Sequence, residues 1–133
     1  LVTDDIFNDY KLTIIALWGS TCGPCYGELD ALNEIYIKYK DEGINVLGIP
    51  LDGDINLDGV KKAIDSLELD FDNIVPDEEF IGELLKITNS TPTALFVNKD
   101  GNFLLEPKVG SYGKEKDIKI FTEIITELTS SEN

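Results

Sequence analysis

The fold is decided by the stretch Trp18-Gly19-Ser20-Thr21-Cys22-Gly23-Pro24-Cys25, which contains both cysteines of the 133-residue chain. The run Leu12–Trp18 leads into it and is apolar, rich in β-branched residues and free of charge. Such a run is typical of a strand buried on both faces of a sheet. An amphipathic helical pattern follows, from Pro24 to a terminating Gly43. We therefore expect a strand, a tight turn with paired thiols, and a helix, in that order.

The rest of the chain alternates strand-like and helix-like segments, which is typical of α/β proteins. We expect further strands at 44–51, 71–75, 93–97 and 103–109, and helices at 56–67, from 77 to near 89, and at 114–128. Asp100-Gly101 between the last two strands predicts a hairpin. The predicted fold is α/β, a central mixed sheet of about five strands with a β-hairpin edge, flanked by about four helices. We expect one domain over residues 1–133, ending in a polar tail at 129–133.

Composition excludes several classes of function. The net charge is −15, from 26 acidic residues against 11 lysines, and such a field repels nucleic acid. The absence of His excludes Ser-His-Asp and Cys-His catalysis. Two cysteines without His cannot complete a tetrahedral zinc site within one chain, so we expect no metal. Because the chain contains no Met, we expect that an N-terminal signal or anchor preceding Leu1 has been removed.

The spacing of Cys22 and Cys25 at the start of a helix favours redox chemistry. The free N–H groups of the first helical turn and the helix dipole stabilise a thiolate at Cys22. Cys25, one turn further in, is expected to be more buried and less ionised. Cys22 would attack a substrate disulfide, and Cys25 would resolve the mixed disulfide. The alternative, a static disulfide, closes so small a loop that it would restrict the unfolded chain little.

A second element, Thr91-Pro92, precedes the strand predicted at 93–97. From the residues alone, Pro92 is a turn residue. The stretch Trp18–Cys25 resembles the active-site motif of the thioredoxin superfamily, and Thr91-Pro92 resembles its cis-proline segment. The Trp-Gly-Ser opening, Glu28 three residues after Cys25, and the helix at 56–67 are similar to the TlpA/ResA-like branch of extracytoplasmic thiol-disulfide oxidoreductases. The resemblance covers about residues 2–128.

The resemblance implies roles for the residues of both elements. Cys22 would be the nucleophile and Cys25 the resolving thiol, with Gly23-Pro24 as the spacer between them. Pro92 would be cis and packed against the cysteines, and the backbone of Thr91 would pair with an extended substrate segment.

One residue departs from the thioredoxin pattern. Ala16 stands where thioredoxin carries a buried Asp, so the proton acceptor for Cys25 must lie elsewhere. Our hypothesis is that Asp52, or less favourably Glu28, accepts this proton. The alternative is that both are solvated surface acids. Trp18 would pack beside the disulfide, or else is an ordinary core aromatic.

By resemblance, the protein is a thiol-disulfide oxidoreductase that reduces disulfides of extracytoplasmic proteins, such as apocytochrome c. The implied partners are these protein substrates and a membrane thiol-relay electron donor, and the redox-active disulfide serves in place of a cofactor. We expect a monomer that binds no nucleic acid. The alternatives are a non-catalytic binding module of the same fold and a redoxin-type peroxidase. Peroxiredoxins rely on an Arg near the reactive cysteine, and this chain has no Arg.

Overall fold

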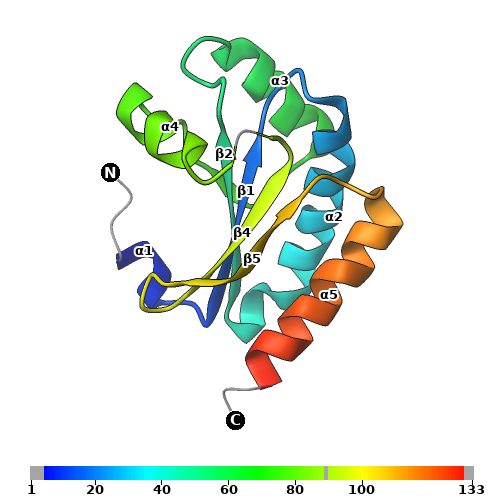
Figure 1. Cartoon of the computed structure of the whole chain (residues 1–133). Helices are drawn as coiled ribbons and strands as arrows, with labels where there is room; N and C mark the ends of the chain where they lie inside the picture. The colour runs from blue at the N-terminus through cyan, green and yellow to red at the C-terminus, as the bar shows by residue number, and fades with distance from the viewer. Residues whose placement is uncertain (1–4, 89, 131–133) are drawn as a thin grey trace.

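The computed structural model describes residues 5–88 and 90–130, which form a five-stranded sheet with helices on both faces (Figure 1). Within this part of the chain, no helix is long and apolar enough to cross a membrane. In chain order the elements are α1 (Asp5–Asn8), β1 (Leu12–Trp18), α2 (Gly23–Tyr39), η1 (Lys40–Glu42), β2 (Ile44–Pro50), α3 (Leu57–Leu67), β3 (Asp72–Asn73), α4 (Glu78–Leu85), β4 (Thr93–Asn98), β5 (Phe103–Val109) and α5 (Lys114–Ser130).

The sheet has the strand order β3-β2-β1-β4-β5, which places β1 at its centre. β1 pairs in parallel with β2 and antiparallel with β4. β3 extends the parallel side, and the β4–β5 hairpin forms the antiparallel edge. The predicted thioredoxin-like mixed sheet with a hairpin edge is therefore confirmed.

Local sequence signals explain where the elements begin and end. All seven residues of β1 are buried, as expected for a central strand covered on both faces. The side chain of Asn56 accepts a hydrogen bond from the Gly59 N–H and caps α3, and Asp77 caps α4 in the same way. Gly43 has a φ of +86° directly after η1, a conformation that glycine adopts without strain.

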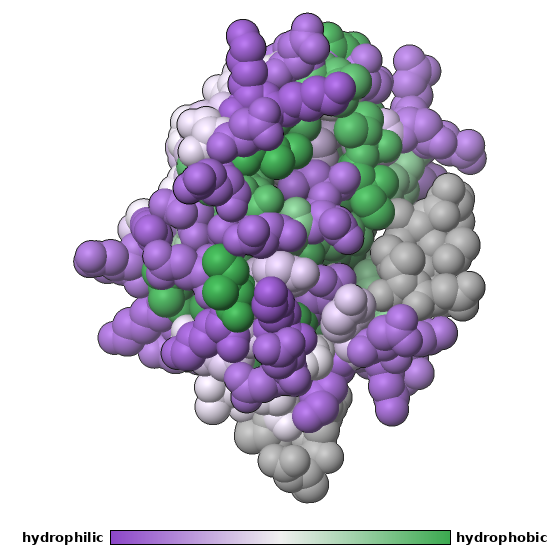
Figure 2. All heavy atoms as spheres, turned by 180° about the vertical axis from the view of Figure 1, so that it is seen from behind, coloured by the Kyte–Doolittle hydropathy of each residue, from purple (hydrophilic) through white to green (hydrophobic). Residues whose placement is uncertain are grey.

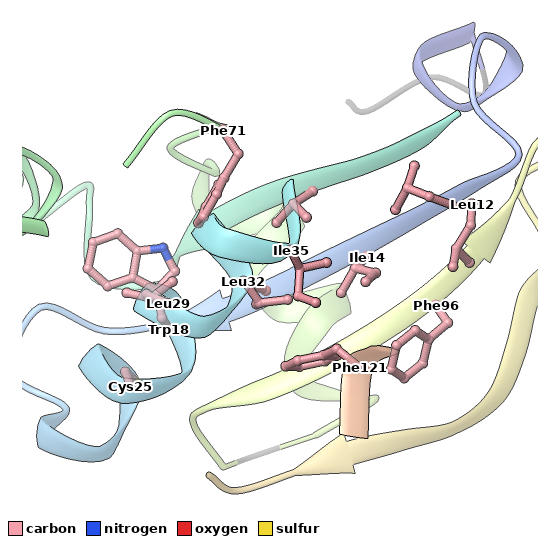
Figure 3. Packing of buried hydrophobic residues seen from close by; sticks show 14 of the residues in the cluster. Leu12, Ile14, Trp18, Cys25, Leu29, Leu32, Ile35, Phe71, Phe96 and Phe121 are labelled. Atoms are coloured by element: carbon pink, nitrogen blue, oxygen red, sulfur yellow. The ribbon is translucent and has the colours of Figure 1, made fainter. Parts of the chain in front are cut away.

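The core has one layer on each side of the sheet. The larger cluster contains residues of α2, α3 and α5 together with the β1 side chains that point toward these helices. Figure 3 shows Trp18 and Cys25 at one end of this cluster, with Phe96 and Phe121 further along. The smaller cluster lies on the opposite face and includes Phe7 and Leu84 from α1 and α4. α2 and α5 lie side by side on this face of the sheet and contact each other (Figure 1), and Phe121 of α5 packs against Phe96 of β4.

Three predicted boundaries are corrected. β3 spans only Asp72–Asn73, because only these residues pair with β2. α4 ends at Leu85 rather than near residue 89, which lies outside the described residues. α5 continues to Ser130, and the Thr129 hydroxyl donates to the Ile125 carbonyl at 2.7 Å, so the predicted polar tail does not begin at 129. Residues 1–4 and 131–133 lie outside the described residues.

Candidate dithiol site

The two cysteines lie at the N-terminus of α2, directly after the central strand. Cys22 is the N-cap residue and Pro24 occupies the first turn, where its missing N–H costs no hydrogen bond. Cys22 and Cys25 form a disulfide with a Cα–Cα distance of 5.4 Å. Cys25 is fully buried, whereas Cys22 is partly exposed and its neighbours Gly23 and Pro24 are exposed. The expected difference in burial between the two cysteines is present.

Trp18 ends β1 and is completely buried in the same cluster as Cys25 (Figure 3). Its indole Nε1 donates a hydrogen bond to Asn73 Oδ1 at 3.0 Å. Asn73 fits there because its amide lies over Gly48; a β-carbon at Gly48 would lie 1.9 Å from Asn73 Oδ1. The edge strand β3 therefore anchors the residue that begins the motif.

The Thr91-Pro92 segment lies at the same end of the sheet as the cysteines. Thr93 pairs with Leu17 in the β1–β4 register, so Pro92 stands beside the end of β1. The Thr91–Pro92 peptide bond is cis, as the resemblance implies, and Pro92 is buried. The Pro92 carbonyl accepts a hydrogen bond from the Gly110 N–H at 2.8 Å, which ties the segment to the loop after β5.

Asp52 follows β2 at this end of the sheet and contacts the loop that precedes Cys22. Its carboxylate accepts hydrogen bonds from the Ser20 backbone N–H at 3.1 and 3.2 Å and from the Ser20 hydroxyl at 2.5 Å. Asn56 Nδ2 donates to the same hydroxyl at 2.8 Å, and the Tyr26 hydroxyl donates to the Ser20 carbonyl. A β-carbon at Gly19 would lie 3.9 Å from both Asp52 Oδ1 and Cys22 Cβ, so both atoms lie close to Gly19.

Glu28 lies one helical turn after Cys25, and only 1% of its surface is exposed. The alternative that Glu28 is a solvated surface acid is therefore wrong. It is buried because α5 and β5 cover this side of α2, where Lys108 Nζ lies 2.7 Å from Glu28 Oε1 and 3.2 Å from Asp117 Oδ1. Asp117 also accepts hydrogen bonds from the Ser111 hydroxyl at 2.5 Å and from the Tyr112 N–H at 3.0 Å.

Burial raises the pKa of Glu28 from 4.5 to about 7. The hydrogen bond and the positive charge of Lys108 oppose this rise, while the negative charge of Asp117 adds to it. A carboxyl group with such a pKa can both take up and release a proton near neutral pH. Among residues 5–88 and 90–130, no three Cys, Asp or Glu side chains are arranged to hold a metal ion.

Comparison with known proteins identifies the family. A model of the AhpC/TSA family matches residues 2–104. The chain belongs to the AhpC/TSA family. The resemblance to the TlpA/ResA-like branch is confirmed by "Thiol-disulfide oxidoreductase ResA" of Bacillus thuringiensis subsp. konkukian, which is 32% identical over 108 residues, covering 80% of this chain. The chain spans 59% of the length of that relative.

Solved structures of similar proteins share the fold of this AhpC/TSA family member. StoA from Bacillus subtilis is 25% identical with a TM-score of 0.66, over 86% of this chain and 84% of StoA. A putative thiol:disulfide interchange protein DsbE from Chlorobium tepidum is 21% identical with a TM-score of 0.75, over 91% of this chain and 82% of its own. These likenesses support the thioredoxin-like fold.

Lys108 and Asp117 belong to the site but were not predicted from the sequence. A signal for Asp117 was present, since Asp117 stands four residues before Phe121 on the buried stripe of α5. Lys108 was harder to find, because β5 contains a register shift and Leu105 has a φ of +62°, which breaks the alternation of sides along the strand.

Proposed function

We propose that this protein is a thiol-disulfide oxidoreductase that reduces disulfides in other proteins through Cys22 and Cys25. The observation that carries the proposal is the Cys22–Cys25 disulfide at the start of α2, in which Cys22 is partly exposed and Cys25 is buried. The name of the ResA relatives supports the same chemistry.

In the proposed reaction the reduced protein begins with a thiolate at Cys22, stabilised by the N–H groups of the first turn of α2. This thiolate attacks one sulfur of a substrate disulfide, which forms a mixed disulfide and releases one substrate thiolate. Cys25 then loses its proton and attacks the Cys22 sulfur, which releases the second substrate thiolate and leaves the Cys22–Cys25 disulfide. A dithiol donor supplies the two electrons that reduce this disulfide for the next cycle.

We propose Glu28 as the acceptor of the Cys25 proton. Cys25 and Glu28 are three positions apart on α2 and therefore share a helix face. Glu28 is buried and has a pKa of about 7, which suits a group that takes up a proton near neutral pH. The sequence favours Asp52 for this role, but the Asp52 carboxylate is engaged with Ser20, in the loop before Cys22. Asp52 is better placed to orient that loop and to influence Cys22.

The substrate is proposed to be an extended protein segment that pairs with the backbone of Thr91 beside the cis Pro92. Exposed apolar side chains lie near this end of the sheet: Ile55 in the loop after β2, Leu57 at the start of α3, and Ile74 and Val75 after β3. The two loops are adjacent, since a β-carbon at Gly53 would lie 3.0 Å from Val75 Cγ1. The β1 arrow points upward in Figure 1, and hydrophobic atoms are visible in the upper half of the molecule in Figure 2. Such surface suits contact with a protein substrate.

The finer features follow the TlpA/ResA-like resemblance. We propose an extracytoplasmic location, with apocytochrome c or other oxidised envelope proteins as substrates and a membrane thiol relay as the electron donor. The protein is proposed to act as a monomer, with the Cys22–Cys25 pair as its only redox group.

The test is reduction of insulin disulfides with dithiothreitol as the electron donor. The wild-type protein should accelerate insulin reduction, and Cys22→Ser should reduce the rate to that of dithiothreitol alone. Equal rates for the two proteins would refute the oxidoreductase and favour a non-catalytic binding module. Consumption of hydrogen peroxide above the Cys22→Ser background would favour the redoxin-type peroxidase instead.

A further inference from the structure

Lys108 is a buried cation on the edge strand β5, with 7% of its side chain exposed. Its ammonium group has three oxygen partners: Glu28 Oε1 at 2.7 Å, Asp117 Oδ1 at 3.2 Å and the Gly110 carbonyl at 2.7 Å. The contacts with Glu28 and Gly110 are hydrogen bonds that the ammonium donates, and the contact with Asp117 is an ion pair. The group also lies 5.1 Å from the centre of the Phe121 ring, which closes it off from that side.

These contacts lead from Lys108 to both halves of the dithiol site. Through Glu28 the ammonium contacts α2 one turn after Cys25. Through the Gly110 carbonyl it holds the residue whose N–H donates to the Pro92 carbonyl at 2.8 Å. Lys114 also pairs with acids of α2, namely Asp30 and Glu34, but its side chain is 40% exposed.

We propose that Lys108 is a positioning residue of the dithiol site, whose ammonium holds the Glu28 carboxylate beside the Cys25 turn and Gly110 against Pro92 at the same time. The proposal rests on the proposed function for its effect on activity, and on the contacts alone for its effect on structure. One cation thereby fixes the relative placement of the thiol-bearing helix and the substrate-facing loop.

The electrostatic consequence follows from the groups that face Glu28. These are Lys108 from β5 and Asp117 from α5. Without the ammonium, two buried carboxyl groups would face each other with no cation between them. Glu28 would then hold its proton to higher pH, because burial and a like charge both disfavour its ionised form.

The experiment compares Lys108→Met and Lys108→Arg with Lys114→Met, a matched loss of an α2-facing lysine at an exposed position. The pH midpoint of Glu28 is measured by NMR of 13C-labelled carboxyl groups, the Gly110 amide by hydrogen exchange, and the pH profile by insulin reduction. For Lys108→Met we expect the Glu28 midpoint to rise by about one pH unit and Gly110 exchange to accelerate roughly tenfold. The activity profile should move to higher pH with the midpoint, and Lys114→Met should match the wild type in all three.

Lys108→Arg separates charge from geometry and decides the matter if Lys108→Met does not fold. Its planar guanidinium keeps the charge but cannot reproduce the arrangement of the three contacts. We expect a Glu28 midpoint near the wild-type value and Gly110 exchange about threefold faster. Unchanged Glu28 midpoint and unchanged Gly110 exchange in whichever of the two variants folds would overturn the proposal. A wild-type protein that reduces no disulfide would refute the proposed function, while the titration and exchange results would still decide the role of Lys108.

Discussion

The carboxylate of Asp52, in the loop after β2, accepts two hydrogen bonds from Ser20, in the loop after the neighbouring strand β1. The backbone N–H of Ser20 lies 3.1 and 3.2 Å from the two carboxylate oxygens, and its hydroxyl lies 2.5 Å from one of them. Ser20 stands two residues before Cys22, so this contact fixes the loop that leads into the nucleophile. Asn56, the cap of α3, donates to the same hydroxyl. The segment that follows β2 therefore orients the loop between β1 and α2, through the contacts of Asp52 and Asn56 with Ser20.

Asp52→Asn tests whether Asp52 acts on Cys22 or on Cys25. The amide oxygen still accepts the Ser20 N–H, but the negative charge near Cys22 is lost, which favours the Cys22 thiolate. We expect the reduced variant to react with iodoacetamide at pH 7 roughly threefold faster than the wild type. Asp54→Asn, an exposed change two residues away, serves as the control. An unchanged alkylation rate with a shifted pH profile of disulfide reduction would instead make Asp52 the proton acceptor of Cys25.

Gly48→Ala tests the anchor of Trp18. The added methyl group would lie 1.9 Å from Asn73 Oδ1 and 3.1 Å from Phe71 Cε1, so Asn73 must move away from the Trp18 indole. We expect the free energy of unfolding to fall by about 1–3 kcal/mol, measured by urea denaturation with the fluorescence of the single Trp. Gly82→Ala is the matched control, since nothing lies within 4 Å of its added carbon. In the middle of α4 that change should be neutral or stabilise by about 0.5–1 kcal/mol. Equal free energies of unfolding for Gly48→Ala and Gly82→Ala would contradict the role of Asn73 in holding Trp18.

Glu28→Gln tests the pH dependence of stability. The folded protein holds the Glu28 proton more tightly than the unfolded chain, because its pKa rises from 4.5 to about 7 on folding. This contribution to stability is fully present below pH 4.5 and is lost as the pH rises through about 7. Its full size is on the order of 3 kcal/mol.

Urea denaturation at pH 5 and pH 8 measures this contribution. The wild type should lose more stability between the two values than Glu28→Gln does. Glu34→Gln, an exposed acid of the same helix that pairs with Lys114, should behave as the wild type. The same pH dependence in Glu28→Gln and the wild type would show that Glu28 is ionised in the fold throughout this range.

The sequence alone was sufficient for the features that depend on local pattern. The apolar run Leu12–Trp18 predicted the central strand, and the Cys-x-x-Cys spacing after it predicted a redox-active cysteine pair at the start of a helix. Alternation of strands and helices predicted the parallel part of the sheet, and the Asp-Gly turn predicted the antiparallel hairpin.

The burial of Glu28 could not be predicted in this way, because its partner Lys108 lies 80 residues away. Periodicity along α2 distinguishes the face toward the sheet but gives no sign of a second covering element, and α5 is that element. The role of Asp52 was obscured for a related reason. Its position near the cysteines followed from the end of β2, but which side of the loop it contacts depends on how Ser20 and Asn56 pack.

The roles of Cys22 and Cys25 are tested most directly by covalent trapping of a disulfide-containing substrate protein. Cys25→Ser and Cys22→Ser are each reduced, freed of reductant and mixed with insulin, and the products are separated on a non-reducing gel. We predict that Cys25→Ser accumulates a mixed disulfide through Cys22 that dithiothreitol removes, whereas Cys22→Ser, left with the buried Cys25, accumulates little. Equal trapping by the two variants, or none by Cys25→Ser, would contradict the assignment of Cys22 as the nucleophile and Cys25 as the resolving thiol.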